Sequence, residues 1–282
     1  MAEEIPEDPS SGIRVIRLWQ WPNILSLDAV AIALAWQSCL ESIRHHPIEF
    51  AEQIILGLSV WLTYMADRLL DVRKRKPVSL LSLRHSWIKK YSFRLWSAWI
   101  PILALNVLLA LYFLDNRQFF RGSILLCLTL LYTVLNQLLS RYWFPKEACV
   151  GFIFSAGLLV FLPEYNAIKD FWLLSSVFVV NCLLISLKEQ RIDAALNQRT
   201  LALGGPLLLC FTLAGCTVIH AIYFKTNLML ALMSGSSITL LLCLYFRSEK
   251  SNEPELFRVQ ADVCLLVTPL LYTLLKASPL IS

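Results

Sequence analysis

Two acidic pairs, each with its members four positions apart, are the residues of this sequence whose types and spacing could do chemistry. The first pair is Asp67 and Asp71 in the segment WLTYMADRLLDVR, and the second is Glu189 and Asp193 in the segment LKEQRID. Residues four apart share one face of a helix, so each pair directs two carboxylates the same way. Carboxylate oxygens are ligands that Mg²⁺ prefers, and protein-bound Mg²⁺ commonly holds a phosphate as well. The spacing therefore predicts a site for magnesium and a phosphate group.

Basic residues close to both pairs complement the negative charge of a phosphate. Arg68 and Arg73 accompany the first pair, Arg191 lies inside the second, and Lys146 lies between the two pairs. Such side chains form charge-assisted hydrogen bonds with phosphate oxygens. Together with Mg²⁺, they would neutralise a diphosphate as it leaves an apolar alcohol. Its departure leaves an allylic carbocation that aromatic faces stabilise, and the chain offers nine Trp, nine Tyr and 15 Phe.

Long apolar segments must position these side chains. The chain has 282 residues, of which 57% are hydrophobic and 16% are charged. A helix that crosses a bilayer needs about 20 predominantly apolar residues, and stretches of that length recur along the sequence. These properties exclude an ordinary soluble domain and predict an all-α, polytopic membrane protein. The loops account for the formal net charge of +5, so the charge gives no reason to expect nucleic-acid binding.

Nine apolar helices are expected, and the charges of their loops set the orientation. Lys and Arg concentrate in the connections that carry the acidic pairs, most densely between residues 71 and 94. By the positive-inside rule, these connections and the N-terminus lie on the cytoplasmic side, so both acidic pairs meet at one face of the membrane. The nine expected segments are 23–42, 49–70, 94–114, 118–140, 147–163, 169–188, 201–223, 226–246 and 257–276.

Two segments are expected to differ from the apolar helices. Residues 1–12 are acidic and polar and lack the features of a signal peptide, which predicts a disordered N-terminal tail. Residues 13–282 are then a single transmembrane domain. Its longest cytoplasmic connection, 72–93, mixes apolar and basic residues over 78–90 as an interfacial amphipathic helix does. That connection is either a lid over the site or a basic anchor to anionic headgroups.

The order of the motifs along the chain is similar to that of a known family. Thr63, Asp67 and Asp71 stand where that family has approximately Asn-x-x-x-Asp-x-x-x-Asp, so a threonine replaces the usual asparagine. The segment RLWQWPN, residues 17–23, precedes the first apolar segment and begins the similarity. On these motifs, the sequence resembles the UbiA superfamily of intramembrane prenyltransferases, over nearly the whole chain.

Two later segments add to this resemblance. Tyr132 and Lys146 lie in segments similar to the tyrosine-containing segment of the family and to its diphosphate-binding lysine. Glu189 and Asp193, followed by the Arg-Thr-Leu of residues 199–201, resemble the second aspartate-rich motif, with a glutamate in place of the first aspartate. The longer glutamate side chain keeps the negative charge at that position.

The resemblance implies a UbiA-like bundle of about nine helices around a central cavity, and an enzyme that depends on Mg²⁺. The implied reaction moves a prenyl group from a prenyl diphosphate to an aromatic or other lipophilic acceptor among the membrane lipids. Asp28 and Asn181 lie inside apolar segments and are further candidates for the cavity. The site residues are expected to be Asp67, Asp71, Glu189 and Asp193 as catalytic Mg²⁺ ligands, Lys146, Arg68, Arg73 and Arg191 as diphosphate ligands, and Asn23, Thr63, Tyr132 and Asn136 in the pocket.

Other interpretations stay open on the sequence alone. A membrane terpene cyclase would use the same metal and diphosphate site but quench the carbocation within the prenyl chain itself. A non-catalytic lipid-binding membrane protein would turn nothing over. Asp67 and Asp71 would then be a helix end paired with Arg68 and Arg73, which stabilises little. Asn136 would be one of the groups that hydrogen-bond neighbouring helices.

Overall fold

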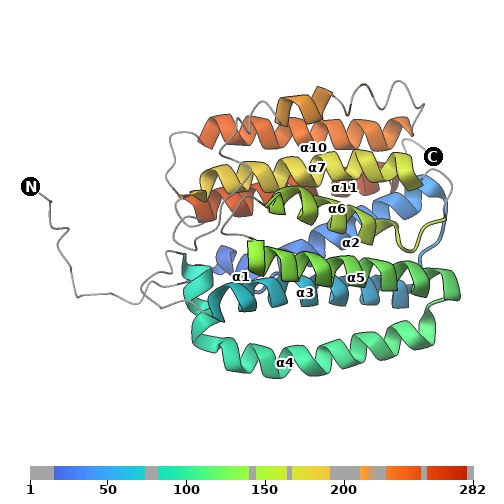
Figure 1. The fold of residues 1–282 in the computed structure, drawn as a ribbon. Coiled ribbons are helices and arrows are strands. Elements are labelled where there is room, and N and C mark those ends of the chain that lie inside the picture. Colours follow the sequence, from blue (N-terminus) through green and yellow to red (C-terminus); the bar gives the residue numbers. More distant parts are fainter. Residues whose placement is uncertain are drawn as a thin grey trace, which may run out of the picture.

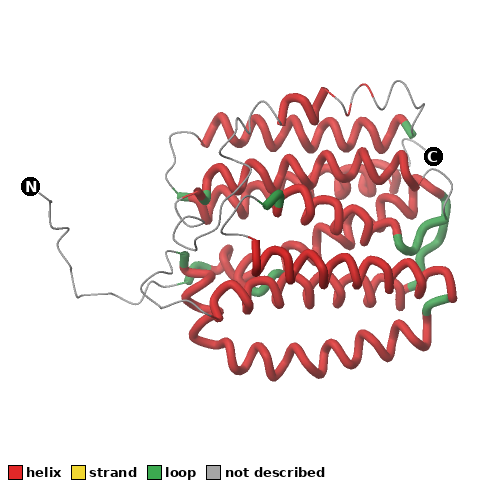
Figure 2. Tube along the Cα trace, viewed as in Figure 1, coloured by secondary structure: helices red, strands yellow, loops and turns green. Residues whose placement is uncertain are grey.

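Antiparallel helices that run the length of the molecule make up the fold in a computed structural model (Figure 1). The structure describes residues 16–73, 82–139, 144–163, 167–190, 210–215, 217, 219, 227–248 and 253–277. Within these residues the regular structure is entirely helical, as Figure 2 shows. The expected all-α class is confirmed.

The helices follow the expected apolar segments along most of the chain. All of the nine segments have a helical counterpart except 201–223, most of which lies outside the described residues. Five described helices are long and apolar enough to cross a membrane, and a bent pair makes a sixth. The helices are α1 (Trp21–Ile24), α2 (Leu27–Arg44), α3 (Phe50–Arg73), α4 (Leu83–Phe113), α5 (Asn116–Leu139), α6 (Lys146–Leu159), α7 (Ala167–Lys188), α10 (Leu228–Arg247) and α11 (Pro254–Ala277), preceded by a 3₁₀ turn, η1 (Leu18–Gln20).

The distribution of burial separates central helices from helices that face lipid. In α7, 78% of the most apolar stretch is buried, and this helix lies in the middle of the bundle (Figure 1). The corresponding values are 6% for α4 and 11% for α5, whose outer faces expose residues such as Leu108 and Leu131. A soluble protein would not leave such surfaces to water. The pattern fits a protein whose α4 and α5 lie against the acyl chains of lipids.

The first expected helix, 23–42, is broken, and this differs from the sequence prediction. Ser26 adopts a left-handed backbone conformation with φ of 59°, and the helical segments on either side of it are bent by 75°. The break frees carbonyl groups, which need new donors in a membrane. Arg68 Nη1 of α3 donates to the carbonyls of Asn23 and Ile24, and Trp61 Nε1 donates to that of Leu25 at 3.0 Å. Side chains of α3 therefore hold the break in place.

The expected connection 72–93 is much shorter than predicted. Helix α3 continues to Arg73 and α4 begins at Leu83, after the Ser82 side chain caps it by accepting from the His85 amide. Lys89 Nζ donates to the carbonyls of Val72 and Arg73 at 2.8 and 3.1 Å, which docks the start of α4 on the end of α3. The described part of the predicted lid is thus a packed helix, and residues 74–81 lie outside the described residues.

Helices α6 and α7 approach each other unusually closely at Gly151. A Cβ atom added there would lie 2.5 Å from Val179 Cγ2 and 2.8 Å from the Val179 backbone nitrogen. Only a residue without a side chain allows this spacing. The close contact brings the start of α6, with Lys146 and Glu147, beside the end of α7.

Candidate functional site

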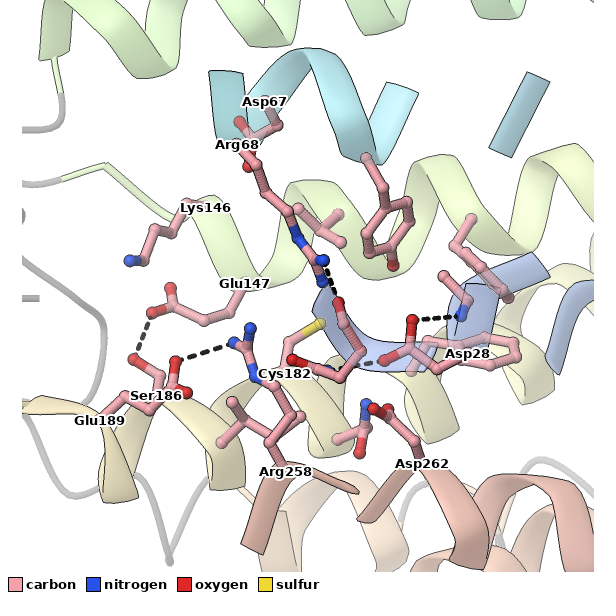
Figure 3. A pocket seen from close by; sticks show the side chains of 18 of the residues that line it. Asp28, Asp67, Arg68, Lys146, Glu147, Cys182, Ser186, Glu189, Arg258 and Asp262 are labelled. Atoms are coloured by element: carbon pink, nitrogen blue, oxygen red, sulfur yellow. Dashed lines mark hydrogen bonds and ion pairs between the residues drawn. The ribbon is translucent and has the colours of Figure 1, made fainter. Parts of the chain in front are cut away.

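A cavity of about 200 Å³ lies at the end of the bundle where α3 and α7 finish and where α4, α6 and α11 begin. Figure 3 shows that side chains from α2, α3, α6, α7 and α11 point into it. The N-termini of helices carry partial positive charge and bind anions well. Three of them at one end of a cavity favour a negatively charged ligand there.

Both members of the first acidic pair line this cavity from α3. Asn136 Nδ2 donates to Asp67 Oδ1 at 3.4 Å, and Gln137 Nε2 donates to Asp71 Oδ1 at 3.4 Å. At 3.4 Å these hydrogen bonds are long, and both come from uncharged amides. Two carboxylates fit Mg²⁺, which binds to one or two protein carboxylates and completes its shell with water and substrate phosphate. Within the described residues, no group of three or more acidic, His or Cys side chains forms a metal site.

The second acidic pair is described only in part. Glu189 lines the cavity, whereas Arg191 and Asp193 lie outside the described residues. Arg258 Nη2 of α11 donates to Glu189 Oε2 at 2.8 Å (Figure 3). Arg84 Nη2 of α4 lies 3.8 Å from the same oxygen. The sequence predicts Glu189 as a Mg²⁺ ligand, but in this structure its carboxylate serves as an ion-pair acceptor for arginine.

Only some of the predicted diphosphate ligands line the cavity. Lys146 lines the cavity from the first turn of α6. Arg68 lines it as well, but its Nη1 atom is engaged by the carbonyls of the broken first helix, which gives Arg68 a structural task. Arg73 is exposed and is not among the cavity residues. The structure therefore brings Lys146 and Arg68 to the site, although the Nη1 atom of Arg68 is already hydrogen-bonded. It leaves Arg73 outside the site.

Three of the four pocket candidates line the cavity. Asn23, Tyr132 and Asn136 do so, as do Asp28 and Asn181 from the apolar segments. Thr63 does not, because its hydroxyl donates to the carbonyl of Ser59 in the previous turn of α3 at 2.8 Å. Its neighbour Tyr64 points to the cavity instead.

Several cavity residues were not predicted from the sequence. Arg84 and His85 line the cavity, although the sequence places them in the loop 72–93. The sequence did indicate them indirectly, because the segment 72–93 that contains them is a possible lid over the site. Arg258 and Asp262 come from the first part of α11, where the sequence shows only a positively charged loop and an apolar helix.

The acidic side chains of the cavity form two separate groups. Glu147 of α6 accepts a hydrogen bond from Ser186 Oγ of α7 at 2.8 Å, close to Glu189 (Figure 3). On the other side of the view lie Asp28 of α2 and Asp262 of α11, and Asn23 Nδ2 donates to Asp28 Oδ2 at 2.6 Å. The cavity thus has polar groups at both ends.

An aromatic wall also lines the cavity. Tyr64 and Phe154 contact edge to face with ring centroids 6.3 Å apart, and Phe154 and Phe178 lie at 4.5 Å. All three residues line the cavity from α3, α6 and α7. The electron-rich faces of such rings attract cations. A cationic intermediate formed in this cavity would therefore be stabilised.

Comparison with known proteins identifies the fold. No family model matches the sequence, and no curated protein matches it. Among solved structures, the chain is similar to the apo structure of a UbiA homolog from Aeropyrum pernix K1, with a TM-score of 0.58 and 10% sequence identity. The match covers 92% of this chain and 100% of the other. This protein thus has a UbiA-like fold, which the sequence resemblance predicted.

Proposed function

We propose that this protein is a Mg²⁺-dependent prenyltransferase that moves a prenyl group from a prenyl diphosphate to an aromatic or other lipophilic acceptor within the membrane. The observation that carries the proposal is the composition of the cavity in a UbiA-like fold. Asp67, Asp71 and Lys146 line the cavity where a diphosphate would bind, which we term the diphosphate end, and the aromatic wall of Tyr64, Phe154 and Phe178 lines the same cavity.

The end of the cavity with Asp67, Asp71 and Lys146 suits a diphosphate leaving group. Mg²⁺ bound to Asp67 and Asp71 would neutralise negative charge on the diphosphate as the carbon–oxygen bond breaks. Lys146 supplies a cation that hydrogen-bonds phosphate oxygens. The N-termini of α4 and α6 add the partial positive charge of their helix dipoles.

The apolar part of the cavity suits the prenyl group. Breaking of the carbon–oxygen bond leaves an allylic cation, and the acceptor then forms a bond to the same carbon and loses a proton. Tyr64, Phe154 and Phe178 present aromatic faces to that cation and exclude water that would otherwise quench it. Asn23 and Tyr132 supply polar groups that can orient an acceptor.

The membrane supplies both substrates in this proposal. The prenyl chain of the diphosphate and the lipophilic acceptor both partition into lipid. The exposed apolar faces of α4 and α5 place the helix bundle in the same lipid. The distribution of Lys and Arg supports a cytoplasmic location for the N-terminus and for the end of the bundle that carries the cavity. A water-soluble diphosphate head would enter from that side.

Turnover of a panel of prenyl diphosphates by the purified protein tests the proposal. We expect diphosphate release that requires Mg²⁺ and an aromatic acceptor. Release without an acceptor, together with a cyclic hydrocarbon or alcohol, would assign a terpene cyclase instead. If no prenyl diphosphate is turned over and lipid binding ignores Mg²⁺, the protein is a non-catalytic lipid-binding protein and the proposal is wrong.

A further inference from the structure

Two guanidinium groups converge on one carboxylate at the diphosphate end of the cavity. Arg258 donates to Glu189 at 2.8 Å, and Arg84 lies 3.8 Å from the same oxygen. The Arg84 and Glu189 side chains are only 9% and 7% exposed. The Arg258 side chain is 20% exposed. One carboxylate cannot accept from all the donors of two guanidinium groups, so this arginine pair needs further acceptor atoms.

The hydrogen-bond donors of the two arginines point to the same need. Arg84 Nε and Nη1 and Arg258 Nε are buried and have no hydrogen-bond acceptor among the described residues. The 3.8 Å separation from Glu189 is too long for a hydrogen bond from Arg84. Buried donors on a charged group that stay unpaired are costly, so such groups are normally paired. A phosphate group offers several acceptor oxygens and suits the planar fork of a guanidinium.

The same geometry makes Glu189 a poor ligand for Mg²⁺. A cation bound to Glu189 would lie close to the positive charges of Arg258 and Arg84, which both approach the Oε2 atom of this carboxylate. Like charges at such distances in a buried site repel strongly. Asp67 and Asp71, by contrast, accept hydrogen bonds of 3.4 Å from the uncharged amides of Asn136 and Gln137.

We infer that Arg84 and Arg258 bind one phosphate group of the diphosphate directly and take the place of a second Mg²⁺. The site then holds a single Mg²⁺, on Asp67 and Asp71, and Glu189 positions the two arginines. This inference rests on the proposed function, and it departs from the symmetric arrangement that two acidic pairs predict.

The number of bound metal ions tests the inference without any variant. Mn²⁺ replaces Mg²⁺ as the probe, inorganic diphosphate is the ligand, and electron paramagnetic resonance counts Mn²⁺ on the full chain in lipid nanodiscs. We expect one Mn²⁺ for each chain at saturating diphosphate. Two Mn²⁺ ions for each chain would overturn the inference alone. If the wild-type protein binds neither diphosphate nor a prenyl diphosphate, both the proposed function and the inference are overturned.

Variants separate binding from a purely structural role. Arg84→Gln and Arg258→Gln should weaken diphosphate binding about ten- to hundredfold by titration calorimetry, because each removes a charged donor. Arg94→Gln on α4 and Arg247→Gln at the end of α10 change the charge equally at exposed positions and should have no effect. Arg84→Lys, which keeps the charge, should restore part of the affinity.

A variant of Glu189 distinguishes a metal ligand from a residue that positions the two arginines. Glu189→Gln keeps an acceptor for Arg258, so we expect an unchanged count of one Mn²⁺ for each chain. Loss of a bound Mn²⁺ from this variant would identify Glu189 as a metal ligand and overturn the inference. If the two arginine variants bind diphosphate like the wild type but unfold at lower temperature, the arginines only fasten the helices together, which also overturns it.

Discussion

Replacement of Gly151 by alanine tests how the α6–α7 contact positions the site. The added Cβ would lie 2.5 Å from Val179 Cγ2 and 2.8 Å from its backbone nitrogen, whereas ordinary contacts begin at 3.4 Å. The helices must therefore separate by about 0.6 to 0.9 Å. The backbone nitrogen of Val179 cannot rotate away as a flexible side chain can, so α6 itself has to move.

The energetic effect can be bounded by comparison with a second glycine of the same helix. Overpacking costs about 1–3 kcal/mol, and alanine regains about 1 kcal/mol of helix propensity in either position. At Gly157 the nearest side-chain atoms to an added Cβ, from Leu125 and Leu56, lie at 3.8 Å, which is ordinary contact. Gly151→Ala should therefore be less stable than Gly157→Ala by about 1–3 kcal/mol.

The displacement of α6 should also lower turnover. Lys146 and Glu147 begin α6, so a shift of this helix moves them relative to Glu189 and Asp67. A misplacement near 1 Å can lower turnover by up to about a hundredfold. Thermal unfolding in detergent and prenyl diphosphate turnover measure the two effects. Equal stability and equal turnover of the two alanine variants would refute the idea that this contact sets the position of the site.

Four shorter predictions concern single residues of the site and its surroundings. Asp67→Asn should lower turnover at least about a hundredfold and raise the Mg²⁺ concentration needed, measured by Mg²⁺ titration, because a metal ligand is lost. His45→Ala, at the other end of α2, should leave both unchanged. Thr63→Val should keep near-wild-type turnover, because the Thr63 hydroxyl donates to a carbonyl within α3. A large loss of turnover would show that Thr63 belongs to the site. Ser26→Gly should raise the stability against thermal unfolding by about 1 kcal/mol, because glycine adopts positive φ without steric cost; a lower unfolding temperature would contradict this explanation.

The part of the site that was predictable from the sequence depends on local periodicity. Asp67 and Asp71 share a helical face and end one apolar segment, and Glu189 ends another, so charge and spacing sufficed to bring them to one end of the bundle. The UbiA-like fold followed from the same motifs and is confirmed by the structural match. Asp193 and Arg191 lie outside the described residues, so their roles stay predictions.

The parts that sequence analysis missed depend on contacts between distant segments. Glu189 and Arg258 are 69 residues apart, and no periodicity within one helix reveals their ion pair. The break at Ser26 is similarly invisible, because a serine in an apolar run gives no sign of positive φ. The donors that make the break tolerable, Trp61 and Arg68, come from α3 and are known only once the helices are packed.

The true start of α4 changes the meaning of the basic residues that the positive-inside rule counts. In a loop, Arg84 would be one of many charges that fix orientation while surrounded by water. In the first turn of a helix docked on α3, the same residue is buried, lies 3.8 Å from Glu189 and faces the cavity. Arg258, near the start of α11, also lines the cavity and donates to Glu189, although its side chain is 20% exposed. Under the proposed function, charges that orient the chain in the membrane would also bind its substrate, because they lie at the end of the bundle where a diphosphate would enter.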